Sequence, residues 1–134
     1  GFNREERADG EWSLFWCAGQ VDPSDLRHLK WYQKVNKFPK ASALTLKSNL
    51  WANFARMQRI HGAAKYDYMP ATFLLPNQCE TFEQTMQDDM RATWDSIWII
   101  KPAAAYCGKG IFLHRSSDEL PDHVRQHRGV ACRY

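Results

Sequence analysis

The sequence lacks the glycine-rich phosphate-binding motifs that are recognisable on their own. Neither Gly-x-x-x-x-Gly-Lys-Ser/Thr nor Gly-x-Gly-x-x-Gly occurs, which excludes a P-loop and a dinucleotide-binding fingerprint. The four cysteines form no Cys-x-x-Cys pair, so a zinc ribbon is not expected. No apolar run approaches the roughly 20 residues that a membrane span needs. Four common explanations for a chain of this size are therefore removed.

The amino terminus also lacks the charged, apolar and small-residue sequence of a signal peptide. Without a secretory signal, the cysteines are expected to be free, buried thiols. His123 and His127 are four residues apart, but two ligands without a third nearby are weak evidence for a metal. We expect these histidines to be solvated. The chain begins with Gly1 instead of Met, which is typical of a fragment.

Composition favours a folded protein. The 134 residues are 44% hydrophobic, 25% charged and 13% aromatic, with six tryptophans, and such a composition supports a real core. This length suits one modest domain or part of a larger one. The formal net charge is only +3, which suits an acidic partner without requiring nucleic acid.

Strands and helices are expected to be mixed along the chain, with no internal repeat, so the fold class is α/β or α+β. Residues 30–40 are basic and aromatic. We interpret them as a loop whose aromatics anchor it to the core and whose lysines face water, with a nucleic-acid patch as the alternative.

The apolar stripes expected to face the core are Leu50, Phe54 and Met57, and Phe82, Met86 and Met90. The expected elements are a polar lead-in (1–11), a strand (12–17), a helix capped at 23–25, a helix from Ser42 or Thr45 to Gly62, a loop (66–70), a strand (72–75), a helix capped by Asn77, a short helix with a capping box at Ser116 and Glu119, and a strand (130–134).

Two short apolar runs, 98–100 and 111–113, flank a loop of small residues, which predicts a strand, a loop and a second strand. Gly108 and Gly110 permit positive φ and a close approach of the backbone to a ligand. Lys101 at the end of the first strand, beside a basic loop rich in backbone amides, suits a polyphosphate. The alternative is an ordinary hairpin whose glycines serve turn geometry.

Nine short segments, taken in order, resemble the tubulin tyrosine ligase-like family, and most of all its polyglutamylase branch. Each segment is weak evidence alone, but nine of them in family order and at family-like spacing are hard to obtain by chance. They extend from about residue 12 to the last residue. The segments are LFW (14–16), LK (29–30), QKVNKFP (33–39), LTLK (44–47), NFARM (53–57), PATFLLP (70–76), WIIKP (98–102), GKGI (108–111) and RY (133–134).

The resemblance implies an ATP-grasp-like fold, in which two α/β parts hold ATP between them. It assigns 12–76 to the N-terminal domain of the ligase and 77–134 to the start of the central ATP-covering domain, incomplete at the hinge. By the family pattern Lys101 contacts the ATP phosphates, the loop 107–110 folds over them, and 132–134 enter the hinge that holds adenine, largely through backbone groups. The residues so implied to bind ATP are Lys101, Cys107, Gly108, Lys109, Gly110, Cys132, Arg133 and Tyr134.

The chemistry implied is the formation of an amide bond between glutamate and a glutamate side chain of tubulin through an acyl phosphate. ATP and Mg²⁺ are the implied cofactors, and the catalytic residues and metal ligands are expected beyond Tyr134. We therefore expect this polypeptide alone to be inactive. The implied partners are the acidic tails of tubulin and microtubules, with glutamate as co-substrate and neither nucleic acid nor membrane. The implied location is the cytoplasm and cytoskeleton, with a cilium or basal body as more specific sites.

The chain departs from the family pattern at several positions. Cys107 stands where the family usually has arginine, and a thiol gives no bidentate contact to phosphate. Leu46 replaces a frequent arginine, Ser48 a frequent aspartate, and Cys132 a frequent hinge glutamine. Two alternatives stay open at this point: a non-catalytic module that binds tubulin or nucleotide, and a ligase of the same fold that adds tyrosine or glycine.

Overall fold

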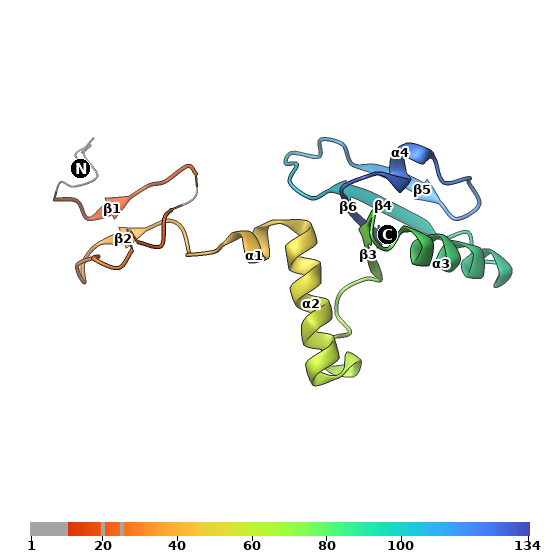
Figure 1. Ribbon diagram of the computed structural model, residues 1–134, viewed down its shortest axis with the longest axis horizontal. Coiled ribbons are helices and arrows are strands. Elements are labelled where there is room, and N and C mark those ends of the chain that lie inside the picture. Colours follow the sequence, from red (N-terminus) through yellow and green to blue (C-terminus); the bar gives the residue numbers. More distant parts are fainter. Residues whose placement is uncertain (1–10, 20, 25) are drawn as a thin grey trace. The chain divides into compact units, whose positions relative to one another are not determined.

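The structure is a computed structural model that describes residues 11–19, 21–24 and 26–134. The first ten residues of the predicted lead-in lie outside this part. By contacts the chain divides into two compact units, with the boundary between Ala41 and Ser42 (Figure 1). The elements are β1 (Leu14–Phe15), β2 (Lys34–Val35), α1 (Ser42–Thr45), α2 (Lys47–His61), the 3-10 helix η1 (Ala63–Tyr66), β3 (Thr72–Leu75), α3 (Cys79–Arg91), β4 (Ile97–Pro102), β5 (Phe112–Arg115), α4 (Asp122–Arg125) and β6 (Gly129–Arg133).

The first unit is held together by a short parallel pair, β1 and β2, and by amide side chains that bridge its loops. The Asn36 amide accepts from the backbone N–H of Cys17 at 2.8 Å and donates to the Cys17 carbonyl at 3.1 Å. The Gln33 amide donates to the Trp12 carbonyl at 3.1 Å. Side chains thus supply hydrogen bonds that a longer strand pair would otherwise make.

Three predictions for this first unit are wrong. The strand expected at 12–17 is only two residues long, and Trp16, which lies within the expected range, is 76% exposed. The segment after Pro23 forms turns in its described residues instead of a helix. The aromatics of 30–40 do not anchor the loop, since Trp31 and Phe38 are 89% and 85% exposed. A unit with two-residue strands offers too little apolar surface to cover these rings.

The second unit is built on a four-stranded sheet in the order β3-β6-β4-β5, in which all neighbours are antiparallel (Figure 1). The strands predicted at 72–75, 98–100, 111–113 and 130–134 all lie in this sheet, within one or two residues of the expected limits. The mixed fold class is confirmed, and the antiparallel sheet makes it α+β. β3 joins the sheet although the implied domain boundary separates it from β4; the domain limits of the ligase stay a prediction.

α3 covers one face of this sheet and closes the core. Phe82 and Met86 of α3 are 0% and 5% exposed, as the predicted stripe requires, whereas Met90 at its end is 41% exposed. Phe82 meets the ring of Trp98 edge to face, with centroids 5.1 Å apart, a preferred aromatic geometry. The buried cluster comprises Leu75, Phe82, Met86, Trp98, Ile100, Leu120, Val124 and Ala131.

α2 begins close to its predicted position and ends at Gly62, whose φ of 90° suits the predicted glycine stop. Only Phe54 of its predicted stripe is buried; Leu50 and Met57 are half-buried. Phe54 stacks on Trp51 and meets Tyr66 and Tyr68 edge to face. The helix therefore rests on a local aromatic cluster as well as on its contacts with β3 and β6.

Three further predictions fail in the second unit. Ser116 is no helix cap: its Oγ accepts a hydrogen bond from the Trp98 indole at 3.1 Å, and α4 begins after Pro121. His123 is exposed as predicted, but His127 is not solvated: it is half-buried near Phe112, with ring centroids 6.2 Å apart. None of the four cysteines forms a disulfide, as predicted, but none is buried: Cys107 is exposed and the other three are half-buried. The Ser116 and His127 side chains are placed by Trp98 and Phe112, which are distant in sequence, and local patterns do not reveal such partners.

Candidate functional site

Lys101 lies near the end of β4, on the sheet face opposite α3. Side chains alternate along a strand, and the buried Trp98 and Ile100 face α3. Lys101 therefore shares the other face with Ile97 and Ile99, which are half-buried. We call this the outer face and define it by Ile97, Ile99, Lys101, Leu113 and Cys132. The pairing registers place Cys132 and Leu113 opposite Ile99.

The Lys101 ammonium makes no hydrogen bond or ion pair within the described part of the chain. Its side chain is half-buried, so the charge is only partly accessible to water. A cation held at a strand end without a carboxylate partner is available to an anionic ligand. This is the arrangement that the sequence predicted for a phosphate contact.

The loop 103–111 beside Lys101 has an unusual backbone. Cys107, Gly108 and Gly110 have φ values of 53°, 74° and 68°, all in the left-handed region that favours glycine. Turn hydrogen bonds join the Lys109 N–H to the Tyr106 carbonyl at 3.2 Å and the Ile111 N–H to the Gly108 carbonyl at 3.3 Å. The exposed Cys107 adopts this conformation without being glycine, at a cost on the order of 1 kcal/mol or more.

The first residue of α2 ties this loop to the rest of the unit. The Lys47 ammonium donates to the Ala105 carbonyl at 2.8 Å, across a separation of 58 residues, and the Lys47 N–H donates to the Ala103 carbonyl at 3.3 Å. Ala103 itself donates to the Arg128 carbonyl at 3.2 Å. Sequence reasoning missed this role of Lys47, because nothing in the local pattern points to a partner so far away.

Gly129, at the start of β6, lies against the carbonyl of Lys101. A Cβ at Gly129 would be 2.2 Å from the Lys101 carbonyl oxygen and 2.8 Å from the Nε2 atom of His127. Real carbon–oxygen contacts are about 1 Å longer, so only glycine fits here. This close approach sets the position of the strand end that carries Lys101, and sequence reasoning did not identify it.

The hinge residues divide between the two faces of the sheet. Cys132 shares the outer face with Lys101, whereas the Arg133 side chain lies on the α3 side, where Asp89 binds it at 2.8 and 2.9 Å. Tyr134 is 77% exposed. The structure thus places Cys132 on the same face as Lys101, two residues along the ladder, and the 107–110 loop after the Lys101 end of β4. Arg133 and Tyr134 lie at the other end of β4, beside Trp98 and Ile97, and the Arg133 side chain is on the opposite face.

An open groove of about 460 Å³ lies elsewhere, between α3 and the segment leading into α4. Met86, Met90 and Leu120 form its apolar part, and Glu83 and Arg125 form an ion pair at its edge. None of the residues predicted to bind ATP lines this groove. Within the described residues, no three acidic, histidine or cysteine side chains are grouped to hold a metal ion, and no helix is long and apolar enough to cross a membrane.

Comparison with known proteins agrees with the resemblance noted in the sequence. The profile of the Tubulin-tyrosine ligase family matches residues 24–134. This chain belongs to that family. The match includes the whole four-stranded sheet, Lys101 and the glycine loop.

Similar curated proteins include several named as tubulin-modifying enzymes. Tubulin polyglutamylase TTLL5 of Homo sapiens is 33% identical over 120 residues, or 90% of this chain and 9% of that protein. Probable tubulin polyglutamylase TTLL2 of Homo sapiens is 31% identical over 84% of the chain and 19% of its own length. A Probable beta-tubulin polyglutamylase of Tetrahymena thermophila is 34% identical over 82% of the chain and 9% of its own length. The chain thus spans less than a fifth of each of these relatives.

Proposed function

We propose that this chain is part of an ATP-dependent ligase that adds glutamate to glutamate side chains of tubulin. The observation that carries the proposal is the unpaired Lys101 ammonium at the end of β4, beside a loop with three left-handed residues, within the described part of the chain. The names of similar proteins support tubulin as the acceptor and glutamate as the residue added. Such an enzyme would act in the cytoplasm at the cytoskeleton, a cilium or basal body included.

The reaction needs activation because a carboxylate is a poor electrophile. In the proposed sequence an oxygen of the acceptor carboxylate attacks the γ-phosphorus of ATP, and ADP leaves. The amine of the incoming glutamate then attacks the carbonyl carbon of the acyl phosphate. Phosphate leaves, the nitrogen loses a proton, and an amide remains. Lys101 would stabilise the charge on the phosphate oxygens, and loss of one such contact typically costs about 2.7–4 kcal/mol of transition-state stabilisation.

The residues of this chain fit a triphosphate better than they fit a metal ion. Lys101 and Lys109 have no carboxylate partner within the described residues, and the Lys109 ammonium lies 5.2 Å from the centroid of the Tyr106 ring. Gly108 has no atom within 4 Å of where a Cβ would stand, which leaves its backbone open to a ligand. The Mg²⁺ ligands stay a prediction for residues beyond Tyr134, and we assign Mg²⁺ no contact in this chain.

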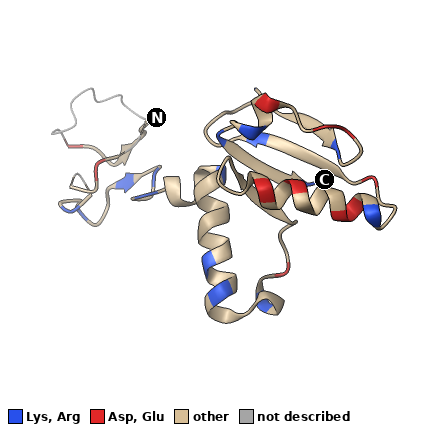
Figure 2. Cartoon of the chain, turned by 45° about the vertical axis from the view of Figure 1, so that its right-hand side comes forward, with Lys and Arg blue, Asp and Glu red and all other residues tan. Residues whose placement is uncertain are grey.

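The distribution of charge supports an acidic acceptor. Residues 26–66 contain nine basic residues and no acidic residue. Figure 2 shows part of this charge along α2, whereas acidic residues gather on α3. Arg56 and Arg59 are exposed and three residues apart on α2, where like charges destabilise a helix by a few tenths of a kcal/mol. An acidic peptide bound along α2 would relieve that repulsion. The nine are Arg27, Lys30, Lys34, Lys37, Lys40, Lys47, Arg56, Arg59 and Lys65.

Lys101→Ala in the full-length protein tests the proposal. Because the side chain has no partner among the described residues, we expect unfolding free energy to change by at most about 0.5 kcal/mol. We expect ATP affinity, measured by calorimetry, to fall at least tenfold, and incorporation of glutamate into tubulin to fall by about 10²–10³. Arg128→Ala is the control, since that side chain is exposed and unpaired in the described part of the chain. Unchanged ATP affinity in Lys101→Ala would remove Lys101 from the site.

The acidic acceptor is tested by charge reversal on α2. We expect Arg56→Glu/Arg59→Glu to weaken binding of a glutamate-rich tubulin tail peptide at least tenfold at low salt, and less at high salt because of screening. Arg128→Glu makes half of the same charge change outside the segment and serves as control. Equal effects of the two variants per unit of charge would indicate general electrostatics instead of a specific surface.

Two alternatives remain, with different expected outcomes. A non-catalytic module would bind ATP or tubulin but would incorporate no amino acid even as the full-length protein. A ligase for tyrosine or glycine would incorporate that amino acid in place of glutamate in a competition assay. We also expect the 134-residue chain alone to attach no glutamate, because the predicted metal ligands are not among its residues.

A further inference from the structure

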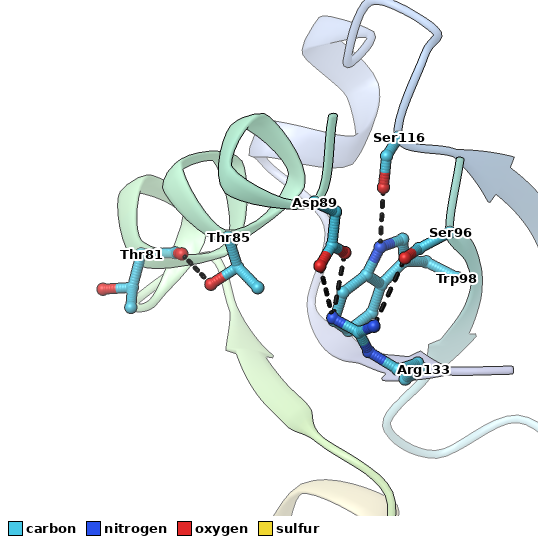
Figure 3. Close-up of polar contacts among 7 residues, drawn as sticks. All are labelled: Thr81, Thr85, Asp89, Ser96, Trp98, Ser116 and Arg133. Atoms are coloured by element: carbon cyan, nitrogen blue, oxygen red, sulfur yellow. Dashed lines mark hydrogen bonds and ion pairs between the residues drawn. The ribbon is translucent and has the colours of Figure 1, made fainter. Parts of the chain in front are cut away.

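Arg133, at the end of β6, is held on three sides by residues from other segments (Figure 3). Its Nη2 donates to both carboxylate oxygens of Asp89 on α3, at 2.8 and 2.9 Å. Its Nη1 donates to the Ser96 Oγ at 3.3 Å. The guanidinium carbon also lies 4.9 Å from the centroid of the Trp98 ring, which is cation–π geometry.

These contacts are firm because the groups around Arg133 are themselves fixed. Trp98 is 0% exposed, and its indole N–H donates to the Ser116 Oγ at 3.1 Å. The Asp89 side chain is 14% exposed and that of Arg133 36%. A charge pair shielded to this degree is stronger than an exposed pair, and a remaining partner is left partly desolvated if the other is removed.

The backbone at the same place is also fixed. The Arg133 N–H donates to the Ala71 carbonyl at 2.8 Å, and the Tyr134 N–H donates to the Ile97 carbonyl at 2.9 Å. Side-chain and backbone contacts together determine how the chain leaves the sheet after Arg133. On the outer face of the same strand lies Cys132, on the side of Lys101. The pairing register puts this strand end beside Trp98, three residues before Lys101 on β4, so the position of β6 sets the spacing between the hinge and the proposed phosphate contact.

We propose that Asp89 is a positioning residue for nucleotide binding, which acts through Arg133. It holds the end of β6 so that residues 132–134 present their backbone to adenine while Lys101 reaches the phosphates. This inference rests on the proposed ATP-dependent function and goes beyond it, because it assigns a role in binding to a carboxylate on the far side of the sheet. A merely structural ion pair would add stability without this effect on the nucleotide.

Asp89→Asn in the full-length protein is the first test, because it removes the charge and keeps the shape. We expect ATP affinity, measured by calorimetry, to fall about tenfold, with the melting temperature lowered by a few degrees. Asp88→Asn is the matched control: Asp88 lies next to Asp89, but binds Arg91 at 2.9 Å instead of β6. We expect its ATP affinity to equal that of the unaltered protein.

A double-mutant cycle tests whether Asp89 acts through Arg133. We expect Asp89→Asn/Arg133→Gln to bind ATP no more weakly than the worse of the two single variants. Arg133→Lys keeps the positive charge but not the planar guanidinium that binds both carboxylate oxygens. We expect its ATP affinity to be about threefold to tenfold lower. If Asp89→Asn does not fold, Arg133→Lys decides the question.

The outcomes separate the two proposals. Unaltered ATP affinity in folded Asp89→Asn, or in folded Arg133→Lys if the former is unfolded, overturns the positioning role. The positioning role is also overturned if Asp88→Asn loses as much ATP affinity as Asp89→Asn. It is overturned as well if the losses of binding free energy in the two single variants add fully in the double variant. If these variants bind ATP normally while Lys101→Ala does not, the positioning role fails and the proposed function stands. If the unaltered protein binds no ATP, both fail.

Discussion

Gly129→Ala offers the sharpest test of the geometry at the end of β4. The new Cβ would lie 2.2 Å from the Lys101 carbonyl oxygen and 2.8 Å from the Nε2 atom of His127. The nearest atom belongs to the backbone, which has no alternative rotamer. To reach an ordinary carbon–oxygen distance, β4 and β6 must separate by about 1 Å. The nearby ladder hydrogen bonds would then lengthen beyond their usual range.

The expected cost follows from this displacement. Overpacking of a well-packed site typically costs about 1–3 kcal/mol, and we expect Gly129→Ala to reach at least the middle of that range. For a domain of roughly 100 residues, each kcal/mol lowers the melting temperature by about 4–8 °C. A decrease of roughly 8–24 °C is therefore expected, measured by thermal unfolding followed through tryptophan fluorescence. In the full-length protein, ATP affinity should fall as well, because Lys101 is displaced.

Two companion variants locate the origin of the effect. Gly19→Ala is the control, since Gly19 has no atom within 4 Å of where a Cβ would stand and has no positive φ; we expect a change within about 0.5 kcal/mol. His127→Ala/Gly129→Ala relieves the contact with the imidazole but not the one with the Lys101 carbonyl. Equal melting temperatures for Gly129→Ala and Gly19→Ala would refute the proposed close approach. Restored ATP affinity in the double variant would refute displacement of Lys101.

Two other predictions concern the loop and a buried histidine. Gly108→Ala and Gly110→Ala should each lose about 1–2 kcal/mol of stability through left-handed strain. The loss should be larger at Gly110, because its new Cβ would lie 2.9 Å from the Pro102 ring. Urea unfolding measures both losses, and a larger loss at Gly108 would contradict this prediction. Burial lowers the pKa of His114, so the unfolded chain binds more protons and stability falls as pH drops below about 6.5. His114→Phe should weaken this dependence in pH-resolved urea unfolding, and a slope equal to that of the unaltered protein would contradict the assignment.

The second unit was largely predictable from local pattern. β3, β4 and β6 were located within one or two residues of their limits, and the start of α3 within one or two residues, because each bears apolar side chains at the spacing of its element. These side chains are buried on folding, and their regular spacing is visible within a short stretch of sequence. The first unit was predicted poorly. Its strands are two residues long, and Trp31 and Phe38 remain exposed there, against expectation.

The candidate site shows the same division between local and non-local information. The sequence alone predicted that Lys101 ends a strand and that glycines follow it, and both features are local. Only the tertiary structure decided that the Arg133 side chain turns to Asp89, 44 residues away in sequence. It also decided that Lys47 holds the loop at Ala105.

The sequence by itself therefore determined where the four strands of the second unit lie and where α3 begins, and it identified Phe54, Phe82 and Met86 as core residues. The tertiary structure decided the strand order β3-β6-β4-β5, the close approach at Gly129, and the face on which each hinge side chain lies. The physical reason is that hydrophobic burial is non-directional. A pattern of apolar residues therefore predicts that a face is buried, but not which element packs against it. Ion pairs and close backbone contacts are directional and short-ranged, and only the assembled fold brings their partners within reach.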